Sequence, residues 1–155
     1  MLTFTVTGIP KGQPRPKAAR RGTFTTVYDP GTADEWKLLI RDAANNAWKC
    51  LGRQVFFQPV AVVLSFSMPR PKGHFRSNGE LKSNSPRFCS SKPDADNLAK
   101  AVLDALTNLG IWQDDSQVVL LSVEKLYANS PSDVGMWCKI VNAPQIPFPK
   151  IVEKA

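Results

Sequence analysis

The sequence predicts a single α+β domain in which a mixed sheet of about four strands packs with two main helices. Three observations favour this class: a modest length of 155 residues, four segments with the residue pattern of strands, and two segments whose apolar residues recur at helical intervals. No internal repeat is visible. We therefore expect one domain over residues 1–142, followed by a proline-rich tail over residues 143–155.

The first part of the chain predicts a strand, a long basic loop and a helix. Leu2–Gly8 alternates apolar residues with threonine, which is the period of a half-buried strand. Residues 9–28 contain three prolines and two glycines, so we expect a long loop or a loose hairpin there. Thr32 and Glu35 have the spacing of a capping box, and apolar residues at helical spacing follow them. A helix is therefore expected from about Ala33 to Lys49.

The rest of the chain predicts a second helix and three strands. Asn97–Leu109 carries an apolar stripe, and Gly110 is expected to stop this helix. Residues 70–93 are rich in proline and serine and have little periodicity, which indicates a long surface loop. The second strand stops before Pro69, and the third is apolar enough at its start for burial on both faces. The three strands are expected at Val60–Met68, Val118–Tyr127 and Met136–Asn142.

Composition excludes several classes of protein. Hydrophobic residues make up 43% of the chain and charged residues 21%, which is ordinary for a globular protein and unlike a disordered one. No apolar run approaches the roughly 18 residues needed to cross a bilayer. The N-terminus lacks the pattern of a signal peptide, so we expect a cytoplasmic protein without membrane contact. The three cysteines form no Cys-x-x-Cys pair, which predicts reduced thiols rather than disulfides or a zinc site.

Basic residues are concentrated in two segments of a chain whose net charge is +7. Residues 11–21 hold five basic residues and no acid, and residues 70–92 hold six against one glutamate. Two solvated loops would explain this pattern, but a polyanionic partner explains the clustering better, because each neutralised phosphate releases counterions. The expected DNA contacts are Arg15, Lys17, Arg20 and Arg21 in the first segment and Lys72, His74, Arg76 and Lys92 in the second. For His74, the single histidine, a DNA contact or no role is favoured over a part in proton transfer.

Four aspartates flank the second predicted helix: Asp94, Asp96, Asp114 and Asp115. Such a helix is about 20 Å long, so the two pairs meet only if the chain after Gly110 returns antiparallel along it. Asp96 could instead be a helix cap, and the second pair could be turn residues. Hydrolysis of a phosphodiester, however, requires an activated water and neutralisation of phosphate charge. Carboxylates that hold Mg²⁺ supply both, and two or three of them suffice.

Lys100 lies four residues after Asp96 and four before Asp104, so the three share one helix face. One interpretation is a surface salt bridge of a few tenths of a kcal/mol. The alternative places the ammonium beside the metal site, where it would contact the scissile phosphate or the leaving oxygen. Asp104 lies one turn further along the helix, so we expect it to be structural.

The segment from Asp94 to Leu106, together with Trp112–Val119, resembles the signature of the RusA family of Holliday junction resolvases. The likeness includes Asp-x-Asp-Asn, a lysine one turn later, Asp-Ala-Leu and Asp-Asp-x-Gln-Val. The resemblance implies a RusA-like fold and assigns the metal-binding acids to Asp94, Asp96 and Asp115. It assigns the essential lysine to Lys100.

The resemblance also implies a homodimer that resolves four-way DNA junctions in recombination and repair, by paired cuts with Mg²⁺ or Mn²⁺. Such proteins are commonly encoded by phages and prophages, so the expected location is the cytoplasm of a bacterial host or a phage-infected cell. The long loop over residues 70–92 departs from the shortest family members and could alter which branched structures are cut.

Two alternatives remain open: a noncatalytic DNA-binding protein, and a nuclease that acts on other branched nucleic acids. A phosphotransferase on small nucleotides is disfavoured, because no Gly-x-x-x-x-Gly-Lys loop is present.

Overall fold

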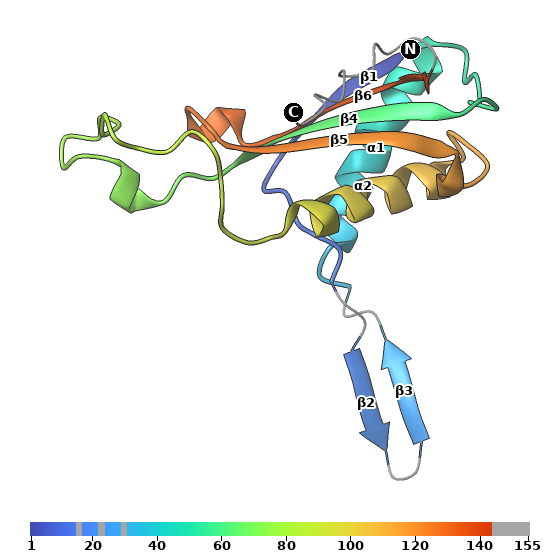
Figure 1. Cartoon of the computed structure of the whole chain (residues 1–155), viewed down its shortest axis with the longest axis horizontal. Coiled ribbons are helices and arrows are strands. Elements are labelled where there is room, and N and C mark those ends of the chain that lie inside the picture. Colours follow the sequence, from blue (N-terminus) through green and yellow to red (C-terminus); the bar gives the residue numbers. More distant parts are fainter. Residues whose placement is uncertain (15–16, 22–23, 29–30, 144–155) are drawn as a thin grey trace, which may run out of the picture.

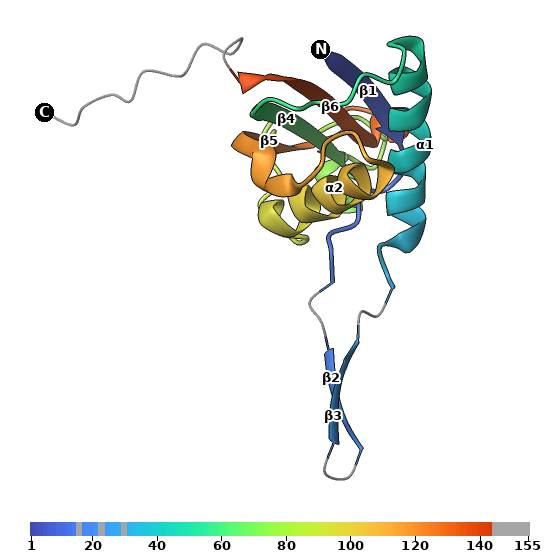
Figure 2. The same cartoon turned by 90° about the vertical axis from the view of Figure 1, so that its right-hand side faces the viewer.

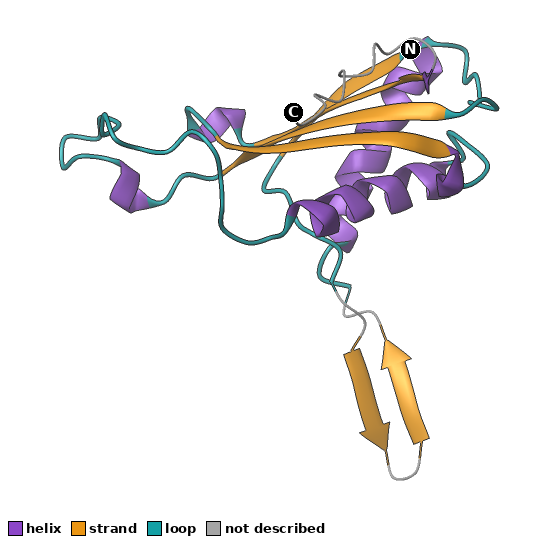
Figure 3. Ribbon diagram, in the orientation of Figure 1, coloured by secondary structure: helices purple, strands orange, loops and turns teal. Residues whose placement is uncertain are grey.

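The protein is seen in a computed structural model that describes residues 1–14, 17–21, 24–28 and 31–143. A four-stranded sheet carries two helices on one face, and a separate two-stranded hairpin extends away from this body (Figures 1, 2 and 3). The α+β class is therefore confirmed. The elements are β1 (Leu2–Thr7), β2 (Lys17–Arg21), β3 (Phe24–Tyr28), α1 (Asp34–Cys50), β4 (Val60–Met68), α2 (Ala95–Leu109), β5 (Val118–Tyr127) and β6 (Gly135–Asn142). Short 3₁₀ turns lie at Lys72–His74, Asp115–Gln117 (η2) and Pro131–Asp133.

The main sheet has the strand order β1-β6-β4-β5. β6 runs antiparallel to both of its neighbours, whereas β4 and β5 are parallel and are connected by α2. Two parallel neighbours need a crossover that takes the chain from the end of the first strand back to the start of the second. α2 makes this crossover. Consequently α2 begins near the end of β4 and finishes near the start of β5 (Figure 1).

The core lies between the sheet and the two helices. On β1, Leu2, Phe4 and Val6 are buried and the intervening threonines are exposed, so one face of the sheet packs inward. Residues of α1 and α2 join the same hydrophobic cluster, among them Trp36, Ile40, Leu98 and Leu106. The two helices are also connected by an ion pair, in which Lys37 Nζ lies 3.6 Å from Asp104 Oδ2.

Helix boundaries follow the sequence closely, but one capping prediction is wrong. The N-cap residue of α1 is Ala33, and its side chain makes no capping bond, so the Thr32–Glu35 capping box does not form. α2 begins at Ala95, two residues before the expected start. Gly110 ends α2 as predicted: its left-handed conformation, with φ of 80°, lets its N–H reach the carbonyls of Leu106 and Thr107.

The prediction that β5 is buried on both faces near its start is also wrong. Val119 is 59% exposed and Leu121 is 42% exposed. The physical reason is strand order, because β5 lies at the edge of the sheet and has β4 on one side. An apolar run alone does not distinguish an edge strand from a central one.

Of the two alternatives expected for residues 9–28, a long loop or a loose hairpin, the described residues form the strands of a hairpin. β2 and β3 pair antiparallel from Lys17 opposite Tyr28 to Arg21 opposite Phe24. The expected tail beyond residue 143 lies outside the described residues. All three cysteines are free thiols, in agreement with the sequence. Within the described residues, none of the helices combines the length and the apolar character that a membrane span requires.

Gly135 provides a test of the β1–β6 pairing. A methyl group at Gly135 would collide with the carbonyl oxygen of Val6. We expect Gly135→Ala to lower the free energy of unfolding by about 2 kcal/mol, as overpacking does elsewhere, and urea denaturation measures this. Gly73→Ala is the control, because the space around Gly73 is open. Equal losses in the two variants would contradict the packing described here.

Candidate functional site

Two carboxylates stand at the N-terminal end of α2. Asp94 occupies the N-cap position, yet its side chain makes no capping hydrogen bond, and Asp96 lies in the first turn. Both residues are exposed. Among the described residues, neither carboxylate is engaged in a hydrogen bond or an ion pair. The pair is therefore accessible and available to a cation.

The segment that leads into the β2–β3 hairpin is attached to this end of α2. The N–H of Gln13 donates to the carbonyl of Asn97 at 2.8 Å. Gly12 packs so closely that an added Cβ would lie 3.1 Å from Asn97 Cβ and 3.2 Å from Pro93 Cβ. An open cleft of about 600 Å³ lies here, lined by Gln13, Pro14, Lys92, Pro93, Asp94 and Asn97. The segment before the basic hairpin and Asp94 therefore share one cleft.

The loop between β4 and α2 is folded against the end of β5 rather than extended. Arg70 donates from Nε to the carbonyl of Ala128 at 3.0 Å and from a terminal nitrogen to the carbonyl of Pro86 at 2.9 Å. Its guanidinium lies 5.3 Å from the centre of the Tyr127 ring, and His74 packs edge-on to the same ring at 4.9 Å. Arg70 and His74 therefore help to shape the loop.

The structure describes the side chains of some of the basic residues predicted to contact DNA and not those of others. Lys72, Arg76 and Lys92 are exposed, and Arg76 lies 3.9 Å from Glu80 in a loose ion pair. Lys17, Arg20 and Arg21 lie on β2, and Arg15 is outside the described residues. His74 is half-buried and packs against Tyr127. Its contact with DNA stays a prediction.

At the other end of α2, the second acid pair divides into two roles. Asp114 caps η2, because its Oδ1 accepts the N–H of Ser116 at 2.8 Å. Hydrogen bonds from the side chain and the backbone N–H of Ser116 lower the pKa of Asp114 below its ordinary value of 3.8. Gln117 completes the capping box by accepting the N–H of Asp114 at its Oε1 over 3.3 Å, and its Nε2 donates to the carbonyl of Phe56 at 3.0 Å. Asp115 is exposed and takes no part in these bonds. The turn interpretation therefore applies to Asp114, and the Asp115 carboxylate stays available.

Within one chain the two acid pairs do not meet. α2 has 15 residues, so about 22 Å of helix separates the pair at its start from the pair beyond its end. After α2 the chain does run back antiparallel along the helix, as β5 (Figure 1). Asp115, however, comes before β5 in the sequence, so it lies at the C-terminal end of α2, opposite the end that carries Asp94 and Asp96. In the described part of the chain, no group of three His, Cys, Asp or Glu side chains could hold a metal ion. In one copy the acids predicted to bind metal therefore lie in two separate groups.

Lys100 is not engaged in the salt bridge considered from its spacing. Asp104 pairs instead with Lys37 of α1 at 3.6 Å. Lys100 is exposed one turn after Asp96, and none of the ion pairs among the described residues includes it. Its ammonium is therefore available to an anion bound beside the acid pair.

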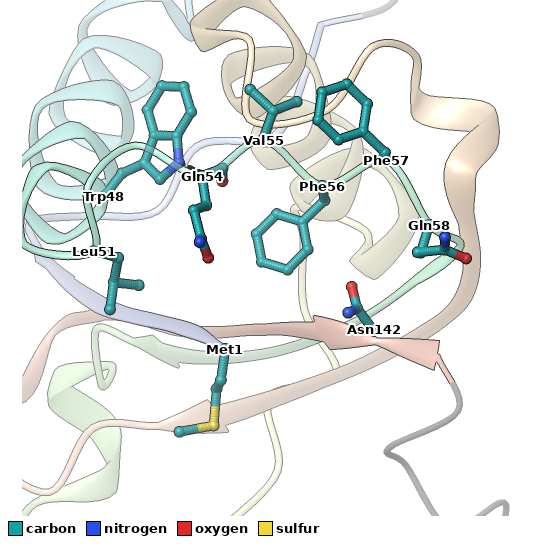
Figure 4. A pocket seen from close by; sticks show the side chains of 9 residues that line it. All are labelled: Met1, Trp48, Leu51, Gln54, Val55, Phe56, Phe57, Gln58 and Asn142. Atoms are coloured by element: carbon teal, nitrogen blue, oxygen red, sulfur yellow. Dashed lines mark hydrogen bonds between the residues drawn. The ribbon is translucent and has the colours of Figure 1, made fainter.

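A second pocket lies elsewhere. A pocket of about 340 Å³ opens between the C-terminal end of α1 and the ends of β1 and β6 (Figure 4). Its lining contains no charged side chain and consists of Met1, Trp48, Leu51, Gln54, Val55, Phe56, Phe57, Gln58 and Asn142. Because acid–base and metal chemistry both need ionisable groups, this pocket is not a catalytic centre.

The cap formed by Asp114 predicts a pH-dependent contribution to stability. Because its pKa is lowered in the folded protein, the contribution is present above the unfolded pKa near 3.8 and is lost as pH falls through the folded pKa. Asp114→Ala is expected to melt at a lower temperature than the wild type at pH 7, with the two curves converging below pH 3.8. Thermal unfolding at several pH values measures this. A difference that persists unchanged at pH 2 would contradict the cap.

Comparison with known proteins identifies the family. The sequence profile described as Endodeoxyribonuclease RusA matches residues 7–134. A relative from Bacillus subtilis strain 168, the uncharacterized protein YqaN, is 32% identical over 132 residues, which cover 84% of this chain and 90% of YqaN. The matched region includes both acid pairs, Lys100 and the two basic segments. The chain therefore belongs to the RusA endodeoxyribonuclease family.

Proposed function

We propose that the protein is a metal-dependent endonuclease that binds branched DNA and resolves four-way junctions by paired hydrolysis of phosphodiester bonds. The proposal rests on the exposed, uncapped pair Asp94 and Asp96, of which Asp94 lines an open cleft together with Lys92. Family membership supports the nuclease activity itself. A purely structural explanation of the pair is weak, because neither carboxylate caps the helix or forms an ion pair among the described residues.

Asp94 and Asp96 fit a divalent metal ion. Both offer hard oxygen ligands, and Mg²⁺ prefers such ligands and keeps several of its waters. Bound Mg²⁺ or Mn²⁺ would supply an activated water and neutralise charge on the scissile phosphate. Lys100, one helical turn from Asp96, would contact the same phosphate and stabilise its developing negative charge. Exposed Lys92, at the edge of the cleft, would hold the DNA backbone nearby.

We infer that the third acid, Asp115, comes from a second copy of the chain. In one copy, about 22 Å of helix separates Asp115 from the other two acids. A two-fold axis perpendicular to an element at the interface places the two copies of that element antiparallel, so that opposite ends lie side by side. Each metal site would then consist of Asp94 and Asp96 of one copy and the partner subunit's Asp115. This arrangement explains why the described part of one chain contains no three-acid cluster.

The β5 edge is the surface that suits such a dimer. Among the described residues, its outer edge makes backbone bonds only near its end, where Lys125 and Tyr127 pair with residues 87–89. The earlier part of the strand exposes Val119 and Leu121, and an exposed apolar edge is a template for pairing with another strand. If the edges of residues 118–124 in two copies pair antiparallel around a two-fold axis, the start of one β5 lies beside Glu124 of the other, next to the part that pairs with residues 87–89.

This pairing would bring the required ends together. Asp115 is three residues before the start of β5, and Asp94 lies near its end, because Lys125 of β5 contacts the carbonyl of Pro93 at 2.6 Å. The dimer would carry two equivalent sites related by the two-fold axis. Such sites could cut two opposed strands of a junction symmetrically. This activity would serve recombination and repair in the cytoplasm of a bacterium or a phage-infected cell.

The direct test is cleavage of a labelled four-way junction beside a linear duplex of the same sequence. We expect paired nicks on the junction in Mg²⁺ or Mn²⁺, none in EDTA, and a loss of about a hundredfold or more for Asp96→Asn. Asp42→Asn is the matched control, because it removes the same charge from an exposed position on α1. Binding without any cleavage in either metal would leave a noncatalytic DNA-binding protein. Equal cutting of flaps, forks and junctions would indicate a broader branched-DNA nuclease.

The shared site makes a separate prediction for mixed dimers. Asp96→Asn and Asp115→Asn are each expected to be inactive alone. When they are unfolded and refolded together, about half of the dimers are mixed by random association. One site of a mixed dimer has no substituted acid, so junction nicking should return, as single nicks rather than paired cuts. A mixture as inactive as either variant alone would contradict ligands shared between two copies.

A further inference from the structure

Lys125 binds the chain immediately before the acid pair. It lies on β5 opposite Phe66 of β4, whose side chain is buried under the helices. Its Nζ donates to the carbonyl of Ser91 at 2.6 Å and to the carbonyl of Pro93 at 2.6 Å. Pro93 is directly followed by Asp94, so one half-buried ammonium joins the edge strand to the backbone of a proposed metal ligand.

The charge of Lys125 is not used in an ion pair. Within the described residues, the ion pairs shorter than 4.0 Å involve other basic side chains. Hydrogen bonds from a charged donor to carbonyls are shorter and stronger than those between neutral groups. Lys125 therefore makes two strong bonds to backbone and keeps its net positive charge at this end of the sheet.

The pKa of the neighbouring Cys89 thiol is affected by these groups. Burial alone would raise the pKa of its thiol, but hydrogen bonds with Ser91 and Tyr127 and the positive charge of Lys125 hold the pKa below its ordinary value of 9.0. The hydroxyls of Ser91 and Tyr127 lie 3.0 Å apart, so Ser91 is held from its side chain as well as from its carbonyl. The segment that enters α2 is thus fixed by β5 at several points.

Asp94 depends on this attachment for its orientation. Its backbone is extended, with φ of −68° and ψ of 149°, and no side-chain capping bond restrains its carboxylate. On the helix side, the carbonyl of Asp94 accepts the N–H of Leu98 at 3.0 Å. On the N-terminal side of Asp94, the hydrogen bond from Lys125 Nζ to the carbonyl of Pro93 restrains the backbone. Together these two bonds hold the backbone from which the carboxylate of Asp94 projects.

We propose that Lys125 is a positioning residue for the divalent-metal site, which holds Pro93 and thereby orients the carboxylate of Asp94 toward the metal ion. The inference rests on the proposed function, because it assumes that Asp94 is a metal ligand. β5 is also the strand proposed to pair with the second copy, so Lys125 would connect the dimer edge to the metal ligands. Groups that orient metal ligands commonly contribute about 10–100-fold to metal affinity.

The test is Mn²⁺ binding to the full-length protein without DNA, measured by calorimetry and by the electron paramagnetic resonance of free Mn²⁺. Lys125→Met is expected to weaken Mn²⁺ binding about 10–100-fold. Lys125→Arg, which keeps charged donors, is expected to recover part of the affinity. Lys139→Met is the matched control, because Lys139 lies on β6 of the same sheet and pairs with Val63 rather than with the segment before Asp94.

Cleavage and junction binding separate positioning from a general loss of structure. In Lys125→Met, the Mn²⁺ concentration for half-maximal cleavage should rise by the same factor, and the rate at saturating Mn²⁺ should largely recover. Junction affinity in EDTA should be unchanged. If Lys125→Met does not fold, Lys125→Gln, which retains a polar donor, takes its place with the same expected results.

The outcomes distinguish the inference from the proposed function. Wild-type Mn²⁺ affinity in a folded Lys125→Met or Lys125→Gln variant, together with lost binding in Asp94→Asn, would overturn the positioning role and leave the metal site intact. Absence of Mn²⁺ binding in the wild-type dimer would overturn the metal site and the inference with it. Equal weakening in Lys139→Met would assign the effect to net charge and would also overturn the inference.

Discussion

The length of α2 is the constraint on which the site depends. β4 and β5 are parallel neighbours, so the chain must cross from the end of one strand to the start of the other, and α2 makes this crossing with 15 residues. The acids before and after the helix are consequently held about 22 Å apart. Flexibility of side chains cannot close that distance. The proposed three-acid metal site therefore needs a second copy, and the proposed dimer pairs through the unpaired part of the β5 edge.

Local contacts decide which charged groups near α2 are available for chemistry. Asp114 is occupied as a cap for the N–H of Ser116, whereas Asp115 beside it is exposed and outside the cap. Asp104 pairs with Lys37 of α1, which leaves Lys100 without that partner. At the start of α2, Asp94 holds the N-cap position but makes no capping bond. The fold thus uses two of these acids for structure and leaves three aspartates and one lysine facing solvent.

Periodicity was sufficient to predict the elements but not their neighbours. The predicted bounds of β4 and β5 match the structure, because Val60–Met68 and Val118–Tyr127 have strong strand patterns between turn residues. The edge position of β5 was missed, since strand order is not encoded in an apolar run. The distance between the acid pairs was also unknown, because it follows from the crossover. A role for Lys125 was not predicted, because Glu124-Lys125 resembles an ordinary pair of solvated residues. The signal that could have indicated it is the position of Lys125 on the helix-facing side of β5.

In the proposed metal site, acids from two copies of the chain hold one metal ion. Crystals of the protein grown with Mn²⁺ test this arrangement, because the anomalous scattering of Mn²⁺ locates the ion independently of the protein. We expect two equivalent peaks per dimer, each between Asp94 and Asp96 of one copy and the partner subunit's Asp115. Peaks surrounded by the acids of a single chain, or peaks away from α2, would contradict it.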